Sequence, residues 1–178
     1  GVPLLATIRT KKEGGLADLT DAAYGELGTA ICHSGLADLL DVEASTAPAV
    51  IAAIQQQARE SGVKTVFSSH NFAETPPTET MVNTLTDMVR RGADIAKLAV
   101  MPRCRSDVLE LLAATAEMAD HHPETPVITM SMGALGAVSR LAGETFGSAM
   151  TFANPGQASA PGQVSLDIVN EVLDALHL

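Results

Sequence analysis

The sequence predicts an α/β protein in which a parallel β-sheet is covered by helices. Short apolar runs alternate along the chain with longer segments of helical period, and the runs recur at roughly the 30-residue spacing of a βαβ unit. Each run is almost continuously apolar, which is typical of parallel strands that are buried on both faces. The chain has 178 residues, 46% of them hydrophobic, which is enough for one domain with a substantial core.

Six strands are expected, each followed by a helix. The first apolar run leads through a loop at residues 11–15 into a helical segment that ends near Cys32. Later helices are expected at residues 45–61, 78–91 and 106–120, from the turn after residue 132 to about residue 143, and from residue 163 onward. The predicted strands are residues 2–8, 36–42, 63–69, 94–100, 126–132 and 148–153.

Two architectures fit such a series of βα units. Six βα units are enough to form a complete open, doubly wound sheet. A (β/α)8 barrel would need two more units, which at roughly 30 residues each would bring the chain near the ~250 residues typical of that fold. Hydrophobic periodicity alone does not choose between the two.

The composition argues against several classes of partner. The formal net charge is −10 and the pI is near 4.8, so the surface repels phosphate backbones and anionic membranes. Only 3% of the residues are aromatic, which argues against a base-stacking platform. No run approaches the ~18 apolar residues of a membrane span, and residues 1–9 carry no signal-peptide pattern. We therefore expect a soluble, cytoplasmic protein that binds neither nucleic acid nor membranes.

Metal and disulfide chemistry is not expected. Cys32 and Cys104 form neither a CxxC pair nor a zinc-ligand spacing, and we expect both to be small buried hydrophobes in a reducing compartment. No HExxH motif or His/Cys grouping suggests a metal site. The glycine-rich turn at residues 133–136 matches neither of the common phosphate-loop motifs, so we interpret it as a tight turn between strand and helix.

Polar residues collect at the carboxyl ends of the predicted strands. Active sites form at these ends in both candidate architectures. Parallel strands bring the ends to one edge of the sheet, so the side chains are expected to share a rim. The residues concerned are Arg9, Glu13, Asp41, Glu43, Ser69, His70, Lys97, residues 130–132 and the loop 154–163.

Lys97 gives the sharpest single signal, because it interrupts the apolar run 94–100 in the middle of a strand expected to be buried. Burial disfavours the charged ammonium, lowers its pKa and so produces the neutral amine that attacks carbonyl groups. A lysine that extends to the end of the sheet, or that is held in a buried ion pair, fits the spacing equally well. The other lysines lie in loops or at a strand start and give no comparable signal.

His70 directly follows the strand 63–69 and precedes a proline-containing loop, so its imidazole is expected at the mouth of the sheet. A general base belongs at this position when a neighbouring strand carries a buried lysine. A structural histidine held by hydrogen bonds is the alternative.

Arg9 and Arg140 are positive charges beside apolar segments of an acidic protein. Guanidinium groups bind carboxylates through paired hydrogen bonds, so a small carboxylic acid is a natural ligand. Surface ion pairs explain the two residues equally well. The loop at residues 154–163 is small, polar and rich in hinge residues, which fits a lid over a ligand or a plain surface loop.

Taken in order, several of these segments resemble type I 3-dehydroquinate dehydratase, an enzyme of the shikimate pathway. The resemblance extends over essentially the whole chain, and its motifs are specific as a set. They are residues 7–15, 41–43, 69–72 with 75–76, 92–102, 128–132, 139–144 and 158–163. The resemblance implies a (β/α)8 TIM barrel that dehydrates 3-dehydroquinate to 3-dehydroshikimate and needs no cofactor and no metal.

The resemblance also implies roles for individual residues. Lys97 is expected to form a Schiff base with the C3 ketone of 3-dehydroquinate. His70 is expected to remove a C2 proton and then to return a proton to the departing C1 hydroxyl. Glu13 would orient His70, and Arg9 would bind substrate oxygens. Arg140, Ser159 and Gln163 would bind the substrate carboxylate and close the lid. Asp41, Met130 and Met132 would support the pocket.

The resemblance further implies that two βα units are missing. Family members begin with two additional units, whose second strand carries a Glu-x-Arg substrate-binding motif, and no such motif precedes Gly1. We therefore expect residues 1–178 to be a single catalytic barrel domain that is N-terminally incomplete, with barrel strands 3–8, and we expect a homodimer. Another Schiff-base lyase such as a class I aldolase, a non-catalytic carboxylate-binding domain and an inactive fragment are the alternatives left open.

Overall fold

The computed structural model describes residues 1–158 and 160–176 and contains a parallel sheet of five strands. The strands are β1 (Leu5–Thr7), β2 (Leu39–Glu43), β3 (Lys64–Asn71), β4 (Ile95–Val100) and β5 (Val127–Ser131). Their order in the sheet is the same as their order in the chain. A doubly wound sheet reverses its strand order at a switch point, whereas a (β/α)8 barrel keeps chain order. The sheet is therefore built as part of a barrel wall.

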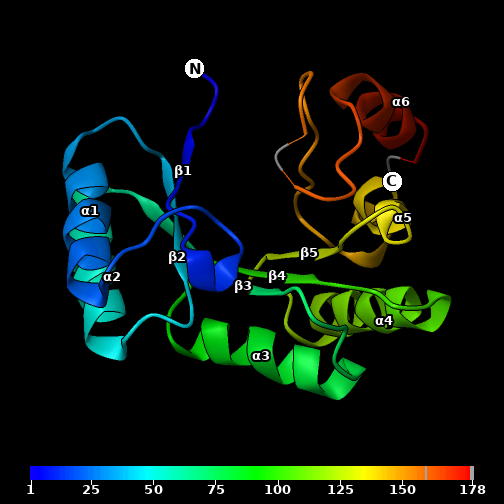
Figure 1. Ribbon diagram of the computed structural model, residues 1–178, viewed down its shortest axis with the longest axis horizontal. Coiled ribbons are helices and arrows are strands. Elements are labelled where there is room, and N and C mark those ends of the chain that lie inside the picture. Colours follow the sequence, from blue (N-terminus) through cyan, green and yellow to red (C-terminus); the bar gives the residue numbers. More distant parts are fainter. Residues whose placement is uncertain (159, 177–178) are drawn as a thin grey trace.

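Helices follow the strands; the first four pack against the sheet, and the last helix packs against the one before it. The helices are α1 (Asp21–His33), α2 (Pro48–Ser61), α3 (Thr78–Arg90), α4 (Arg105–His121), α5 (Ala137–Leu141) and α6 (Leu166–Leu176), with 3₁₀ turns η1 (Lys11–Glu13) and η2 (Glu144–Phe146). Figure 1 shows α1 beside α2 and α3 beside α4, with α5 and α6 near the end of β5. The loop predicted at residues 11–15 thus contains a 3₁₀ turn.

Local sequence signals set the helix ends. Thr20 caps α1, because its Oγ1 accepts the backbone N–H of Ala23 at 3.2 Å. Pro48 begins α2, and Gly62 ends it in the left-handed conformation with φ 72°. As a result α1 starts at Asp21, which is later than hydrophobic periodicity alone predicts.

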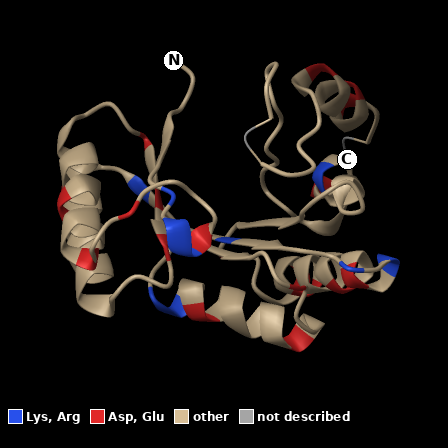
Figure 2. Cartoon of the chain, in the orientation of Figure 1, with Lys and Arg blue, Asp and Glu red and all other residues tan. Residues whose placement is uncertain are grey.

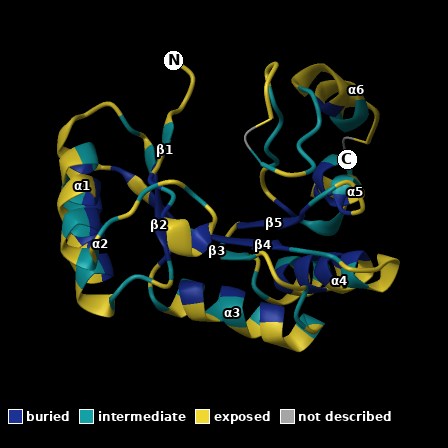
Figure 3. Ribbon diagram, in the orientation of Figure 1, coloured by how far each residue is buried: buried dark blue, intermediate teal, exposed yellow. Residues whose placement is uncertain are grey.

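The strands place alternate side chains in two apolar layers. Phe67 and Leu98 point toward the helices and join the main core, whereas Val66 and Ala99 belong to a smaller cluster on the opposite face. Figure 3 shows β2, β4 and β5 almost wholly buried, β1 partly exposed, and the outer sides of the helices exposed. Lys97 is two residues from Ala99 in β4 and therefore points to the same inner face.

The predicted sixth strand at residues 148–153 does not form, so this prediction was wrong. Ser148 makes only an isolated parallel bridge with Val127. The Oγ of Ser148 accepts the backbone N–H of Thr129 at 3.1 Å, so a side chain takes an amide that a longer ladder would use. The last helix also starts later than residue 163, at Leu166, after a bridge between Asn154 and Ser165.

One of the two cysteines is not buried as expected. Cys32 is buried as predicted, but Cys104 is exposed. Cys104 is the N-cap residue of α4, and both its backbone N–H and its Sγ contact the Asp107 carboxylate, which holds it at the start of the helix. Acidic residues are spread over the outer helices (Figure 2). No helix in the described part of the chain is long and apolar enough to cross a membrane.

Candidate active site

Lys97 lies in the middle of β4 and is only 5% exposed. Its Nζ is 2.9 Å from Nε2 of His70 and 3.4 Å from Oδ2 of Asp41. Burial is the main influence on this amine and lowers its pKa, while the Asp41 carboxylate acts in the opposite direction. The two interpretations of Lys97, as a buried amine and as a member of a buried ion pair, are therefore both correct.

His70 lies near the end of β3 and uses both ring nitrogens. Nε2 contacts Nζ of Lys97, and Nδ1 is 2.8 Å from Oε2 of Glu13. Burial is the largest influence on the imidazole and lowers the pKa of His70, and the hydrogen bond to Glu13 opposes it. The arrangement suits a neutral ring that donates Nδ1–H to Glu13 and presents Nε2 as an acceptor toward Lys97.

Glu13 ends the turn η1 and is buried. Its backbone N–H donates to the Thr10 carbonyl at 3.1 Å, and Ser45 Oγ donates to its Oε1 at 2.7 Å. Gly14 follows with φ 83°, a left-handed conformation that residues with a side chain rarely adopt, so the turn favours glycine here. The turn thereby fixes one carboxylate oxygen on Ser45 and directs the other to His70.

Arg9 follows β1 and is held by side chains of the two neighbouring strands. Its Nη2 is 2.8 Å from Oδ1 of Asp41. Its Nη1 is 3.1 Å from Oε1 of Glu43 and donates to Oγ of Ser68 at 3.0 Å. Arg9 is therefore part of a buried network, and its predicted contact with substrate oxygens stays a prediction.

Arg140 extends from α5 into the inner face of the sheet and is only 2% exposed. Its Nη2 donates to the Pro161 carbonyl at 3.2 Å, and its Nη1 lies 3.5 Å from Sδ of Met130. Its Nε has no hydrogen-bond partner among the described atoms. Burial lowers the pKa of Arg140.

These side chains line one cavity of about 390 Å³. Every described residue to which the family resemblance gives a role lies on its wall, whereas Ser159 is outside the described residues. Glu43 and Ser69 were also expected at this rim, but they line two other pockets. The lining residues from the prediction are Arg9, Glu13, Asp41, His70, Lys97, Met130, Met132, Arg140 and Gln163. The cavity has the size and mixed lining of a small-molecule site.

Sequence reasoning missed several residues that line this cavity or contact its polar side chains. Phe152 lies with its ring centroid 5.6 Å from Lys97 Nζ, and Phe72 stacks on His70 with 6.3 Å between ring centroids. Ser68 donates to Asp41 Oδ1 at 2.6 Å and faces Lys97 across the β3–β4 register. Because Ser68 pairs with Lys97 on the neighbouring strand, the alternation of side chains along the two strands could have indicated that Ser68 faces the site. No local pattern indicates Phe152.

A metal or cofactor site is a separate question. In the described part of the chain, no group of three or more His, Cys, Asp or Glu side chains is arranged to hold a metal ion. That no cofactor is needed stays a prediction.

Comparisons with known proteins give a consistent answer. The family model described as type I 3-dehydroquinase matches residues 1–178. The 3-dehydroquinate dehydratase of Syntrophotalea carbinolica is 48% identical over 176 residues, which are 99% of this chain and 70% of that protein.

Solved structures agree with the sequence relatives. A type I 3-dehydroquinate dehydratase from Clostridium difficile, with covalently modified comenic acid, superposes with a TM-score of 0.94 at 44% identity and covers 98% of this chain and 69% of its own. The 3-dehydroquinate dehydratase of Geobacillus kaustophilus gives a TM-score of 0.94 at 47% identity, over 98% of this chain and 67% of its own. The barrel-type fold predicted from the sequence is thereby confirmed. The chain belongs to the type I 3-dehydroquinase family, which is a family of hydro-lyases.

Proposed function

We propose that this chain dehydrates 3-dehydroquinate to 3-dehydroshikimate through an imine on Lys97. The observation that carries the proposal is the 2.9 Å contact of Lys97 Nζ with His70 Nε2 in a cavity whose wall also holds the buried Arg140. A buried amine beside an imidazole supplies a nucleophile and a base, and a guanidinium supplies a site for a carboxylate. The names of the relatives support the substrate, because they are called 3-dehydroquinate dehydratases.

Lys97 carries out the first step. Its neutral amine attacks the C3 ketone of the substrate, and the ketone oxygen leaves as water after it has gained protons. His70 lies within hydrogen-bond distance, takes up the proton that the amine releases and passes it to the ketone oxygen, so that its ring is neutral again before the elimination. Burial lowers the pKa of Lys97 and so raises the fraction of neutral amine. The protonated imine that results withdraws electrons from C2.

His70 carries out the elimination. Its Nε2 removes a proton from C2, and the electrons of that bond pass into the imine as an enamine. They return to form the C1–C2 double bond as the C1–O bond breaks, and the departing hydroxyl leaves as water with the proton from His70. Glu13 accepts Nδ1–H and stabilises the imidazolium between these two events. Hydrolysis of the imine then frees Lys97 and the product.

Recognition of the substrate carboxylate is assigned to Arg140 and Gln163, with Ser159 as part of the same proposal. Support comes from Arg140, whose buried guanidinium faces the cavity and whose Nε has no hydrogen-bond partner in the part of the chain that the structure describes. A buried donor that lacks a partner costs free energy, and a bound carboxylate would restore its hydrogen bond. Arg9 is assigned to substrate oxygens on the opposite wall.

The test is a dehydration assay of the purified chain with 3-dehydroquinate. We expect a rise in ultraviolet absorbance as the conjugated enone forms, and irreversible loss of activity when borohydride is added with substrate but not without it. Quinate, which has a hydroxyl in place of the C3 ketone, is the matched control and should give no trapping. Trapping only with a sugar phosphate would indicate an aldolase, and no trapping with any ketone would indicate a binding domain; either result contradicts the proposal.

We also propose that the protein is a cytoplasmic homodimer. Exposed apolar side chains on α5 and α6, including Val138, Leu166 and Ile168, offer surface for association. Cys32 and Cys104 are both free thiols, which suits a reducing compartment. Sedimentation equilibrium should give twice the 18.4 kDa mass of the chain, and a monomer at all concentrations would contradict the assembly.

A further inference from the structure

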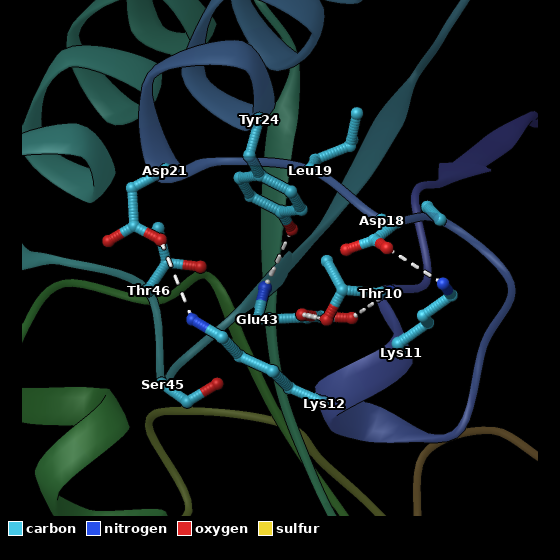
Figure 4. Close-up of a pocket in the computed structure, with 11 residues that line it drawn as sticks. Thr10, Lys11, Lys12, Asp18, Leu19, Asp21, Tyr24, Glu43, Ser45 and Thr46 are labelled. Carbon is cyan, nitrogen blue, oxygen red and sulfur yellow. Dashed lines mark hydrogen bonds and ion pairs between the residues drawn. The ribbon is translucent and has the colours of Figure 1, made fainter.

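Glu43 is a buried carboxylate for which the reaction has no use. It is the last residue of β2 and is 2% exposed. It lies behind the active-site cavity and lines a second, small pocket of about 50 Å³. Figure 4 shows its carboxylate beside Thr10, with the Tyr24 hydroxyl directed at the backbone nitrogen of Glu43. A buried carboxylate is costly unless it is hydrogen-bonded, so its partners show what it does.

The partners of Glu43 are two consecutive residues of the chain. Its Oε1 accepts the backbone N–H of Thr10 at 2.7 Å and lies 3.1 Å from Nη1 of Arg9. Its Oε2 accepts the Thr10 hydroxyl at 2.6 Å. Hydrogen bonds to an ionised acceptor are stronger than neutral ones. Glu43 therefore fixes both the backbone and the side chain at the point where β1 passes into the turn η1.

This point of attachment controls the position of Glu13. The Thr10 carbonyl accepts the backbone N–H of Glu13 at 3.1 Å and that of Gly15 at 2.8 Å. Arg9 also lies with Nη1 3.6 Å from Oε2 of Glu13, the oxygen that contacts His70. Two routes, one through the backbone and one through the guanidinium, thus connect Glu43 with the carboxylate beside the base.

We propose that Glu43 is a positioning residue that holds Thr10 and Arg9 and through them aligns the Glu13 carboxylate with Nδ1 of His70. It touches neither substrate nor the reacting atoms. The inference rests on the proposed function, in which His70 is the base. The alignment matters because a displacement of about 1 Å at a catalytic group can cost on the order of a hundredfold in rate.

The test uses Glu43→Gln, which keeps the shape but removes the charge and replaces one acceptor oxygen by a donor. We expect kcat to fall roughly tenfold to hundredfold, and KM to rise by a smaller factor because Arg9 is less firmly held. Nuclear magnetic resonance of the His70 ring nitrogens should show a loss of the Nδ1–H form and a lower pKa, because the bond to Glu13 weakens and Arg9 is less neutralised. Glu43→Asp keeps the charge on a shorter arm and should recover only part of kcat.

A second variant tests the connection through Thr10, and it keeps the inference testable if Glu43→Gln fails to fold. Thr10→Val keeps the backbone N–H but loses the hydroxyl that donates to Oε2. It should shift the His70 spectrum in the same direction by a smaller amount, and the two effects on kcat should be less than additive in the double variant. The matched control is Glu60→Gln, an exposed residue of α2, which should change nothing.

The outcomes separate this inference from the proposed function. If the parent chain does not dehydrate 3-dehydroquinate, the proposed function fails, while the His70 spectrum still tests the alignment. If folded Glu43→Gln or Thr10→Val loses thermal stability but keeps the parent His70 spectrum and kcat, Glu43 is a structural residue only. That result would overturn the inference.

Discussion

The two walls of the cavity are built in opposite ways. On the wall formed by β1 to β4, the side chains of Lys97, His70 and Glu13 are joined in a chain of contacts of 2.8 to 2.9 Å, and Glu13 is anchored in turn by Ser45. On the wall formed after β5, Arg140 makes one hydrogen bond to a backbone carbonyl and one long contact to sulfur, and its Nε has no partner among the described atoms.

The difference indicates that one wall carries out proton transfer and the other recognises the substrate. Groups that move protons need fixed geometry before substrate arrives, and hydrogen bonds from the fold provide it. Groups that recognise the substrate gain affinity when their own hydrogen bonds are completed only by the ligand. Mutations on the first wall should therefore change the chemical steps, and mutations on the second wall should change binding.

The largest effect is expected from Lys97→Ala. The variant should fold but lose turnover entirely, because no neighbouring group can supply the electron sink of the imine. Lys97→Arg should be equally inactive, since a guanidinium stays protonated. Thermal unfolding checks that the variants fold, and the enone assay checks that they do not turn over. Near-normal elimination by either variant would contradict the mechanism.

His70→Ala should reduce turnover by roughly 10² to 10⁴, the range of general acid–base catalysis. The imine should still form slowly, because Lys97 keeps its burial and its ionic partner Asp41. Intact mass spectrometry should then show the accumulated adduct, which cannot lose its C2 proton. A folded variant with an unchanged elimination rate would show that another group is the base.

Arg140→Met should weaken substrate binding about tenfold to hundredfold, which corresponds to the loss of a hydrogen bond to a charged group. The free protein should not lose stability, because the change removes a buried cation whose Nε has no hydrogen-bond partner among residues 1–158 and 160–176. Calorimetric titration with substrate and thermal unfolding are the measurements, with Arg59→Met on the exposed side of α2 as the control. A large drop in kcat with unchanged affinity would contradict the division between the two walls.

A smaller effect is expected on the pH dependence of stability. Burial lowers the pKa of His70 below its ordinary value of 6.5, so between these two values the unfolded chain binds more protons than the folded one. The contribution of His70 is therefore complete above about pH 6.5 and is lost as the pH falls through that window. The parent should lose more thermal stability than His70→Gln between about pH 7.5 and pH 5.5. Equal losses would show that His70 is not the group responsible.

The smallest effect is expected from metal removal. The protonated imine takes the place that a divalent ion would otherwise have in stabilising the carbanion-like state. Dialysis against a chelator should leave the dehydration rate unchanged. A loss of activity that zinc or magnesium restores would refute this prediction.

Much of the site could be read from the sequence for identifiable physical reasons. Lys97 stands out because a charge in an apolar strand needs an explanation, and strand alternation places it on the inner face. His70 follows from the rule that carboxyl ends of parallel strands share a rim. Arg140 was indicated by its charge beside an apolar segment, as one of two arginines that could bind a carboxylate, whereas the role of Glu13 came only from the family resemblance.

The rest depends on contacts that no local pattern encodes. The network of Arg9 with Asp41, Glu43 and Ser68 exists only because β2 and β3 pair in a register that sets Glu43 opposite Ser68. The predicted strand 148–153 was lost because the Ser148 hydroxyl binds a strand amide in place of a backbone carbonyl, a choice that hydrophobicity does not reveal.

The central claim is that the imine forms on Lys97 and on no other lysine. The chain has three other lysines, Lys11, Lys12 and Lys64, which are exposed and serve as internal controls. Peptide mapping by mass spectrometry after borohydride reduction with 3-dehydroquinate tests the claim directly. We predict a single reduced adduct, on the peptide that contains Lys97, and none in Lys97→Ala. An adduct on another lysine, or none on folded protein that still dehydrates the substrate, would contradict it.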